Sequence, residues 1–502
     1  MARTTLALTS FVSGEFGNKL TGRTDFDKYQ SAAKTMENFL VHPQGAATRR
    51  VGTQFIASVK TAAAKTRLIP FEFSTTQTYI LEFGNNYIRF FKDKGQILSG
   101  GSAYEISTPY LTAELFDIKF AQSADVMYLV HPNHEVMKLS RTGHTSWSLA
   151  EVDFTNGPYL AVNSTTTTLT PASASVGTGV NITASAVTGI KGGSGFLATD
   201  VGRLITFNSG IAKITARTNT TVVVCTILTA FANTDAKDDW KLGAFSDTTG
   251  HPSCVSFYEQ RLVFAGTTSE PQTVFFSKAG DYENMTSGTN ADEAMVYTIA
   301  ANQVNVIRYL KAQRTLVIGT TAAEYTVSAD GTDASITPTN ITIKRQSSYG
   351  SANVDAVTAG NAILFLQKAK RKIRELAYNF DSDSYVAPDL TILNDSVTDS
   401  GIVQMEWQQE PNNNLWCVRD DGQLACLTYQ RSENVVSWSR HIIGGAFGSG
   451  NAVVESIASI SGDLNEDELW IIVKRTVNGA TARYVECFSD FDFDETAATD
   501  FK

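Results

Sequence analysis

From residue 54 onward, hydrophobic and polar positions alternate with a period of two, which is typical of β-strands. The clearest example is TYILEFGNNYIRFF at 78–91, which predicts two strands joined by a turn at Gly84-Asn85-Asn86. The same pattern of apolar strand, short polar or glycine-containing turn and second strand returns at 125–154, 260–278, 314–328, 362–378, 414–430 and 468–488. We therefore expect a mostly β protein built from repeated hairpins.

The hairpins recur at a nearly constant spacing. Their leading strands, which we interpret as the inner strands of repeating units, begin near Tyr79, Met127, Leu262, Leu316, Ile363, Leu415 and Leu469. The intervals are 48, 135, 54, 47, 52 and 54 residues, and removing an 86-residue insertion from the second interval leaves 49. A period near 50 residues with a hairpin in each unit is the signature of a β-propeller, whose blades are four-stranded sheets. We predict about seven blades, with six to eight possible; the alternative is a series of unrelated β-sandwiches.

The insertion runs from 160 to 245 and begins with a stretch rich in Thr, Ser, Ala and Gly. It contains expected strands at 203–207, 212–216 and 221–228, separated by turn residues Gly210 and Asn219, which predicts a small β-barrel or sandwich. The expected organisation is an N-terminal arm (1–53), the first blades (54–159), the inserted β domain (160–245), the remaining blades (246–489) and a solvated acidic tail (490–502).

Before the first hairpin, the pattern changes to a helical period. Phe26, Tyr29, Ala33, Met36 and Leu40 recur at spacings of three and four, which places them on one face of a helix over 24–40. Thr24 and Asp27 fit a capping box, and Pro43 ends the helix by His42. We predict a short amphipathic helix that docks on a neighbour.

The same segment resembles a known family. Ser13-Gly14-Glu15, then GR-x-D-x-x-KY at 22–29, ENF at 37–39 and P-Q-G-x-x-T-R-R-x-G-T at 43–53 resemble the start of tail nozzle proteins of short-tailed bacteriophages (podoviruses). These proteins are also called tail tubular protein B or stabilisation proteins. DVGRLI at 200–205, W-x-LGAFS at 240–246 and HPSCVSFYEQRL at 251–262 fit as well, so the resemblance is good over 11–300 and weaker beyond. The family's usual Pro after the Arg pair is replaced by Val51.

The resemblance implies a structural virion protein and not an enzyme. It implies a ring, expected to be a homo-hexamer, that forms the distal DNA conduit of the phage tail, retains packaged DNA and passes it during DNA ejection. The implied partners are tail adaptor or portal-side proteins, tail fibres or spikes, and double-stranded DNA that passes without specific binding. The inserted domain would extend an interface or narrow the bore. The alternative is a carbohydrate-binding or glycan-hydrolysing propeller that recognises a receptor.

Seven residues of the arm are the candidate neighbour-protein interface: Arg23, Asp25, Lys28, Tyr29, Asn38, Arg49 and Arg50. For the Arg pair, a salt bridge to a neighbouring protein and a local structural role are equally open.

Charge and cysteine content narrow the possible functions. The net charge is −10, and because residues 1–50 carry seven Lys/Arg against four Asp/Glu, the remainder carries −13. Such a body is a poor general binder of nucleic acid and suits a conduit that repels DNA. Five scattered cysteines predict reduced thiols and assembly in the host cytoplasm before incorporation into the virion. We expect no signal peptide and no membrane span.

Residues that could support chemistry are sparse. His131 and His134 form the one close histidine pair, but Pro132 and Asn133 make the intervening turn and further ligands are missing from the local sequence, so we predict no metal site. Asp381, Asp383 and Asp389 lack the pattern of a calcium loop. The basic run KAKRKIR at 368–374 favours a solvated hairpin turn over a DNA contact. We predict no catalytic residues and no cofactor.

Overall fold

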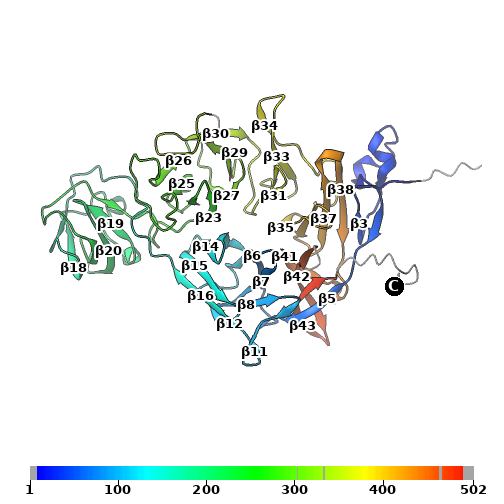
Figure 1. The fold of residues 1–502 in the computed structure, drawn as a ribbon, viewed down its shortest axis with the longest axis horizontal. Coiled ribbons are helices and arrows are strands. Elements are labelled where there is room, and N and C mark those ends of the chain that lie inside the picture. Colours follow the sequence, from blue (N-terminus) through cyan, green and yellow to red (C-terminus); the bar gives the residue numbers. More distant parts are fainter. Residues whose placement is uncertain (1–7, 302, 332–333, 463–465, 490–502) are drawn as a thin grey trace, which may run out of the picture.

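Seven antiparallel sheets, each with a path of four strands, surround a central axis in the computed structural model, which describes residues 8–301, 303–331, 334–462 and 466–489 (Figure 1). The first strands of most neighbouring sheets contact one another around that axis. This arrangement confirms the predicted β-propeller and its seven blades. The described residues contain short 3-10 helices and no α-helix.

The blades follow the chain in order. Blade 1 comprises β6 (Arg67–Ser74), β7 (Gln77–Gly84), β8 (Tyr87–Lys92) and β12 (Glu105–Ser107), with β9 (Gly95–Gln96) beside β8. Blade 2 comprises β13 (Lys119–Ser123), β14 (Val126–His131), β15 (His134–Gly143) and β16 (Ser146–Glu151). Blade 3 comprises β23 (Cys254–Tyr258), β24 (Arg261–Ala265), β25 (Thr273–Phe276) and β26 (Met295–Thr298). Blade 4 comprises β27 (Ile307–Ala312), β28 (Leu316–Thr320), β29 (Glu324–Ser328) and β30 (Thr342–Ser347).

The remaining blades complete the ring. Blade 5 comprises β31 (Val357–Ala359), β32 (Ala362–Leu366), β33 (Ile373–Asn379) and β34 (Ser384–Val386). Blade 6 comprises β35 (Ile402–Gln408), β36 (Asn414–Arg419), β37 (Leu424–Gln430) and β38 (Val435–His441). Blade 7 comprises β41 (Val453–Ser461), β42 (Asp467–Val477), β43 (Ala480–Phe488) and β5 (Thr53–Ser58). Two short hairpins and two 3-10 helices lie in connections: β10 (Leu98–Ser99) with β11 (Ser102–Ala103), β39 (Ala446–Phe447) with β40 (Gly450–Asn451), η3 (Leu115–Asp117) and η6 (Arg431–Glu433).

Closure of the ring joins the two ends of the propeller. β5 pairs antiparallel with β43, so a strand from the start of the chain is the outer strand of the last blade. The sequence-based boundary, which placed residue 54 in the first blades, is therefore corrected. The β5–β43 pairing thus closes the propeller by backbone hydrogen bonds between the two ends of one chain.

The core is divided among the spaces between blades. Seven hydrophobic clusters each combine side chains from two neighbouring blades, all the way round the ring. The regularly spaced strands of the sequence are β7, β14, β24, β28, β32, β36 and β42, the second strand of each blade. The sequence analysis interpreted them as the innermost strands, and this interpretation is wrong. Second strands read as long apolar runs because the blades on both sides cover them; β28, for example, is buried throughout.

The insertion joins blades 2 and 3 and has a hydrophobic cluster of its own. Its strands form one six-stranded sheet in the order β17 (Leu169–Pro171), β18 (Gly177–Ala184), β21 (Val222–Thr229), β20 (Gly210–Arg217), β19 (Leu204–Phe207) and β22 (Lys241–Leu242). Two 3-10 helices, η4 (Lys191–Gly193) and η5 (Ala198–Asp200), lie between β18 and β19.

The expected barrel or sandwich is not confirmed, because the edge strands β17 and β22 do not pair along their length. Near that gap, Leu169 and Lys237 exchange backbone hydrogen bonds at 2.8 and 3.0 Å, and the Asn163 N–H donates to Trp240 O at 2.9 Å. The predicted turn at Gly210 is also displaced: Asn208 and Ser209 adopt positive φ and make the turn, and Gly210 begins β20.

The predicted amphipathic helix over 24–40 is wrong. Residues 8–52 instead contain η1 (Asn18–Leu20), η2 (Asp27–Ser31) and two small strand pairs, β1 (Gly14–Glu15) with β2 (Ala32–Ala33), and β3 (Phe39–Val41) with β4 (Ala47–Arg49). Thr24 caps nothing, since Phe26 occupies the N-cap of η2. Met36 and Leu40 are buried as expected, but a spacing of four also places two residues on one side of an extended chain. The edge of blade 6 supplies the backbone partners that a helix would otherwise provide.

The two parts outside the ring lie at opposite ends of the molecule. Figure 1 shows the inserted sheet at one end of the long axis and the N-terminal arm, beside β38, at the other. The acidic tail predicted for 490–502 lies outside the described residues.

Candidate functional site

The N-terminal arm, residues 8–52, is fixed to the outer edge of blade 6. The Asn38 backbone N–H donates to Arg440 O at 2.8 Å, and the Arg440 N–H donates to Met36 O at 2.9 Å. Glu37 and Arg440 thereby form a parallel bridge, so the arm adds an extra chain segment to β38. A strand edge that would otherwise be open is thus covered.

Glu15 is the buried anchor of this contact. Its Oε2 accepts the Met36 backbone N–H at 2.8 Å, and its Oε1 lies 2.9 Å from Arg440 Nε. The Asn394 side-chain amide donates to the backbone oxygens of Ser13, at 3.3 Å, and of Glu15. A carboxylate this deeply buried is stable only when charge and hydrogen bonds compensate it, as they do here.

Asn38, one of the residues predicted to contact a neighbouring protein, shapes the arm. It adopts positive φ, and its Oδ1 accepts the Ile442 N–H at 2.9 Å. Its backbone oxygen accepts the Arg50 N–H at 2.8 Å. All of these partners lie within the same chain, so the structure gives Asn38 a local role.

The two members of the Arg pair differ. Arg50 donates to the backbone oxygens of Val51 (2.6 Å) and Ile442 (3.3 Å), and its guanidinium lies over the Phe488 ring at 5.3 Å. Burial lowers the pKa of Arg50, with the charge of Arg49 adding to the effect. Arg49 is exposed at the end of β4. The local structural role therefore belongs to Arg50, and Arg49 faces solvent.

The tip of the arm carries the other predicted residues. Arg23 Nε and Nη2 donate to the two oxygens of Asp25, each at 2.8 Å, and both side chains are more than half exposed. The hydrogen bond from Arg23 lowers the pKa of Asp25 to about 2. Lys28 is exposed, whereas Tyr29 packs edge-on against Phe16 at 6.4 Å and its hydroxyl accepts the Gly22 N–H. Arg23, Asp25 and Lys28 remain accessible, and Tyr29 supports them.

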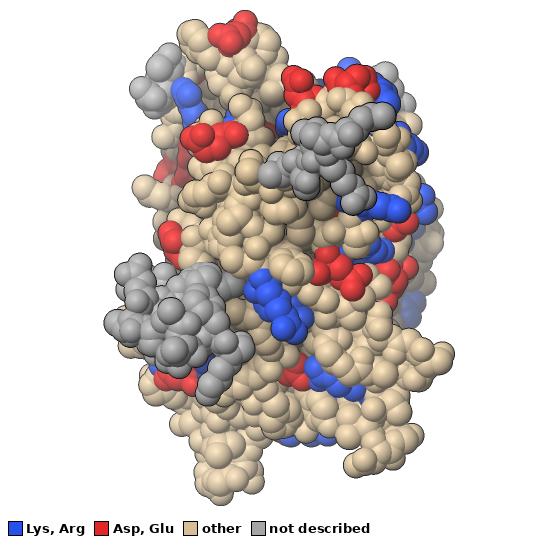
Figure 2. Space-filling model, turned by 90° about the vertical axis from the view of Figure 1, so that its right-hand side faces the viewer, with Lys and Arg blue, Asp and Glu red and all other residues tan. Residues whose placement is uncertain are grey.

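Residues from the far end of the chain complete this surface, and sequence reasoning missed them. Gly17 N–H donates to Leu393 O at 2.8 Å, and Lys19 pairs with Asp395 at 2.5 Å. Ile392, directly beside this contact in sequence, is 70% exposed. We call Arg23, Asp25, Lys28 and Ile392 the arm-tip surface. Figure 2 views this end of the molecule and shows basic and acidic side chains interspersed on it.

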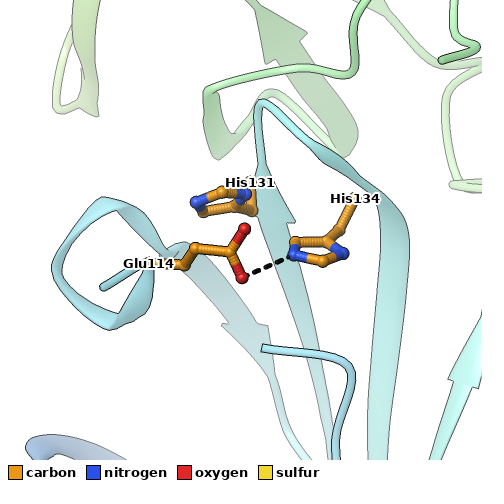
Figure 3. Close-up of side chains that lie close together, drawn as sticks. All are labelled: Glu114, His131 and His134. Carbon is orange, nitrogen blue, oxygen red and sulfur yellow. Dashed lines mark hydrogen bonds and ion pairs between the residues drawn. The ribbon is translucent and has the colours of Figure 1, made fainter. Parts of the chain in front are cut away.

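A second group lies in blade 2 and its neighbouring connection (Figure 3). Glu114, just before η3, and His131 and His134, at the two ends of the β14–β15 turn, each offer a ligand atom, and these atoms lie within 4.8 Å of one another. His134 Nε2 is 2.8 Å from Glu114 Oε2. The sequence prediction of no metal site rested on the missing third ligand, which the fold supplies from the preceding connection.

The environment of this group favours charge on the carboxylate. Burial alone would raise the pKa of Glu114, but hydrogen bonds from the Leu111 N–H and from His134 outweigh it and lower the pKa. Burial also lowers the pKa of His131, and the nearby His134 adds to this shift. The arrangement therefore presents an anionic oxygen beside two ring nitrogens.

The other sequences that were tested for chemistry do not form sites. Asp383 accepts the Tyr378 hydroxyl at 2.6 Å, whereas Asp389 bonds Thr391 and pairs with Lys372 at 2.9 Å. The basic run forms the β32–β33 turn, with Lys368, Lys370, Arg371 and Lys372 exposed and Arg374 buried. The five cysteines are buried, and none of them forms a disulfide in the described structure. Within the described ranges, no helix is long and apolar enough to cross a membrane.

Comparisons with known proteins add little beyond the fold. No protein-family model matches the chain, and neither does any curated protein. The chain is similar to the Pan2 WD40 domain of Neurospora crassa, at 10% identity and TM-score 0.33, covering 74% of this chain and 88% of that one. It is similar to YCF48 bound to D1 peptide, at 11% identity and TM-score 0.32, covering 90% and 98%. It is also similar to the Cps50 (Swd1) β-propeller domain of Myceliophteria thermophila, at 8% identity and TM-score 0.34, covering 87% and 100%. Similarities at this level carry no argument about function.

Proposed function

We propose that this chain is a structural subunit of a bacteriophage tail nozzle, a protein of the virion and not an enzyme. The proposal starts from the resemblance of residues 11–53 and of the later phrases up to residue 262 to tail tubular protein B. In this role, copies of the chain form a ring of six at the distal end of a short tail. The ring retains packaged DNA and passes it during ejection.

The observation that carries the proposal is the placement of two separate appendages on opposite sides of one propeller (Figure 1). A closed ring requires each subunit to present two different surfaces, one to each neighbour. The inserted sheet at blades 2 and 3 and the arm at blade 6 provide two such surfaces. The propeller between them is a stiff spacer, because a hydrophobic cluster joins each blade to the next all the way round the propeller.

The arm-tip surface is the part suited to a protein neighbour. Arg23 and Asp25 form an ion pair with two hydrogen bonds, which orients both side chains while they remain exposed. Ile392, whose chain neighbour Leu393 accepts the Gly17 N–H of the arm, exposes apolar area, and burying such area on association is favourable. Mixed charges around an apolar contact are typical of protein interfaces. We assign the exposed tip of the arm to the adaptor or portal side, the rest of the arm to the neighbouring subunit of the hexamer, and tail fibres or spikes to other faces.

The charge of the chain is compatible with a conduit for DNA. A net charge of −10 disfavours tight binding to phosphates, so double-stranded DNA would pass without specific contacts. The exposed lysines of the β32–β33 turn are confined to one turn and are already counted in this net negative charge.

A binding experiment with paired variants tests the proposal. The purified chain is mixed with the adaptor protein of the same phage, and the complex is measured by light scattering and negative-stain imaging. Ile392→Asp and the double variant Arg23→Glu, Lys28→Glu are expected to weaken the complex at least about tenfold, as for interface hot spots. Lys278→Glu, which breaks an exposed 3.0 Å pair with Asp292 on blade 3, is the control and should bind normally. Equal binding by all variants contradicts the assigned surface, and hydrolysis or binding of host glycan by a monomer would favour the receptor-binding alternative.

A further inference from the structure

Glu114, His131 and His134 come from two segments that the propeller brings together. His131 ends β14 and His134 begins β15, so a two-residue turn separates them, while Glu114 precedes η3 in the connection from blade 1. Figure 3 shows the Glu114 carboxylate directed toward both imidazoles. His131 is 1% exposed. Neither the propeller core nor the proposed tail function uses this group.

We infer that these three side chains form a binding site for a transition-metal dication, with Zn²⁺ the best fit. Two imidazoles and one carboxylate are a ligand set that zinc takes in proteins, leaving a fourth position for water or another group. Zinc bonds of 2.0–2.2 Å place neighbouring ligand atoms about 3.3 Å apart in a tetrahedral site. The three atoms already lie within 4.8 Å of one another, and His134 Nε2 is 2.8 Å from the Glu114 oxygen. Small side-chain rotations are enough to reach the bonding geometry.

The surroundings support a bound species at this group. Tyr110 is fully buried and lies edge-on to the rings of His131 and His134, at 6.1 and 5.2 Å. Its hydroxyl has no hydrogen-bond partner in the described structure. A buried polar atom without a partner costs free energy. A metal-bound water is one group that would relieve this cost.

The donor set also selects among metals. Nitrogen and carboxylate ligands suit Zn²⁺, Co²⁺ and Ni²⁺, whereas Ca²⁺ and Mg²⁺ prefer oxygen ligands throughout. His131 Nδ1 now accepts the Asn133 N–H at 3.2 Å. Coordination by His131 competes with that bond, whichever ring nitrogen binds. A long hydrogen bond inside a turn is a small loss against two metal–nitrogen bonds and one metal–oxygen bond.

The test is metal binding by the full chain after treatment with a chelator. Zinc chloride is titrated against the protein in competition with a chromophoric chelator, and cobalt chloride is added separately to record the visible absorption of a tetrahedral site. We expect one metal per chain. Loss of an outer-sphere partner typically costs 10–100-fold in metal affinity, so loss of a direct ligand in His131→Ala or His134→Ala should cost at least about a hundredfold.

Two further variants guard against misfolding and surface binding. Glu114→Gln keeps the shape of the side chain and an oxygen for His134, yet removes the charge, so it should weaken binding without unfolding the protein. His144→Ala is the matched control, because His144 lies in the β15–β16 turn of the same blade and bonds the Tyr79 hydroxyl at 2.7 Å. It should bind metal normally. Absence of stoichiometric binding in the unmodified chain, or binding that survives in all three ligand variants, overturns the inference.

Discussion

Glu15 Oε1 lies 2.9 Å from Arg440 Nε, and this ion pair joins the start of the chain to the outer strand of blade 6. The Glu15 side chain is 3% exposed, whereas that of Arg440 is 27% exposed. The same carboxylate accepts the Met36 N–H, so one side chain fixes two parts of the arm at once. The arm is therefore packed against blade 6 as part of the folded protein.

Replacing Glu15 should release the arm while the propeller stays folded. Glu15→Ala leaves Arg440 without its anion and the Met36 N–H without an acceptor, at a cost of about 1–3 kcal/mol. We expect faster hydrogen exchange and proteolysis across residues 13–38, with unchanged protection in blades 1 to 5. Asp25→Ala, in the exposed pair at the tip, is the control and should leave exchange at Met36 and Asn38 unaltered. Equal protection in both variants would show that Glu15 does not anchor the arm.

Alanine substitutions at two glycines distinguish the effect of a steric clash with blade 6 from the effect of backbone strain alone. Gly14 and Gly22 both have positive φ, at +62° and +81°. A Cβ on Gly14 would lie 2.5 Å from the backbone N and O of Trp438, whereas a Cβ on Gly22 would meet nothing within 4 Å. Both alanine variants carry the left-handed penalty of about 1–2 kcal/mol, but only Gly14→Ala should also displace β1 from blade 6. Exchange rates of the Glu15 and Met36 amides measure this, and similar rates in both variants would contradict the packing described.

Truncation should reveal the closure strand. Removal of residues 1–52 leaves β5 paired with β43, so we expect a folded propeller that unfolds cooperatively. Removal of residues 1–59 exposes the edge of β43 and uncovers its buried Val485 and Cys487. An open edge with apolar side chains promotes aggregation, and the melting temperature should fall well below that of the shorter truncation. Identical thermal unfolding of the two truncations would exclude the proposed closure.

Glu82 predicts a pH dependence of stability. It is fully buried, its Oε1 accepts the Tyr87 hydroxyl at 2.5 Å, and its Oε2 has no partner in the described structure. Burial raises its pKa from 4.5 to about 7, against the lowering effect of Tyr87. Between these values the folded state binds more protons than the unfolded state, so the free energy of unfolding falls as pH rises. Above pH 7 the penalty is on the order of 3 kcal/mol.

Glu82→Gln should remove that penalty. The variant is expected to be more stable than the unmodified protein at pH 8, and the difference should disappear as the pH falls toward 4.5. Chemical unfolding at several pH values measures both limits. Glu105→Gln is the control, because Lys60 and Arg89 lower the pKa of Glu105 against the opposing effect of its partial burial. That variant should gain no stability at pH 8; a Glu82→Gln protein without a gain there contradicts the burial argument.

The propeller could be predicted because every blade repeats the same pattern of buried and exposed positions. Each blade has a second strand covered on both faces, and such strands appear as apolar runs at a spacing near 50 residues. The sequence identified all seven of these strands but not the first strands that line the axis, because those are shorter or more polar, as in Val357–Ala359. It also did not show that β5 belongs to blade 7, since strand pairing between the two ends leaves no local pattern.

The arm and the candidate sites show where local reasoning fails. Met36 and Leu40 are four residues apart, which fits a helix and a strand equally well. The extended form is stabilised by backbone hydrogen bonds to the edge of blade 6. Arg50 and Asn38 were predicted to lie on the surface. In the structure, Arg50 contacts Val51, Ile442 and Phe488, and Asn38 accepts a hydrogen bond from Ile442. Glu114 and Ile392 were missed because each lies far in sequence from the other residues of its candidate site. Arg23, Asp25 and Lys28 were named as interface candidates because of the family resemblance; the structure shows them exposed, but not on the predicted helix.

The measurement that tests the central claim most directly is the mass of the full chain and of the chain lacking residues 1–52, each alone and with the phage adaptor protein, by multi-angle light scattering. The nozzle account predicts a ring of about six subunits for the full chain, formed alone or on the adaptor, and failure of the truncated chain to bind the adaptor. A full chain that stays monomeric in both conditions would contradict it.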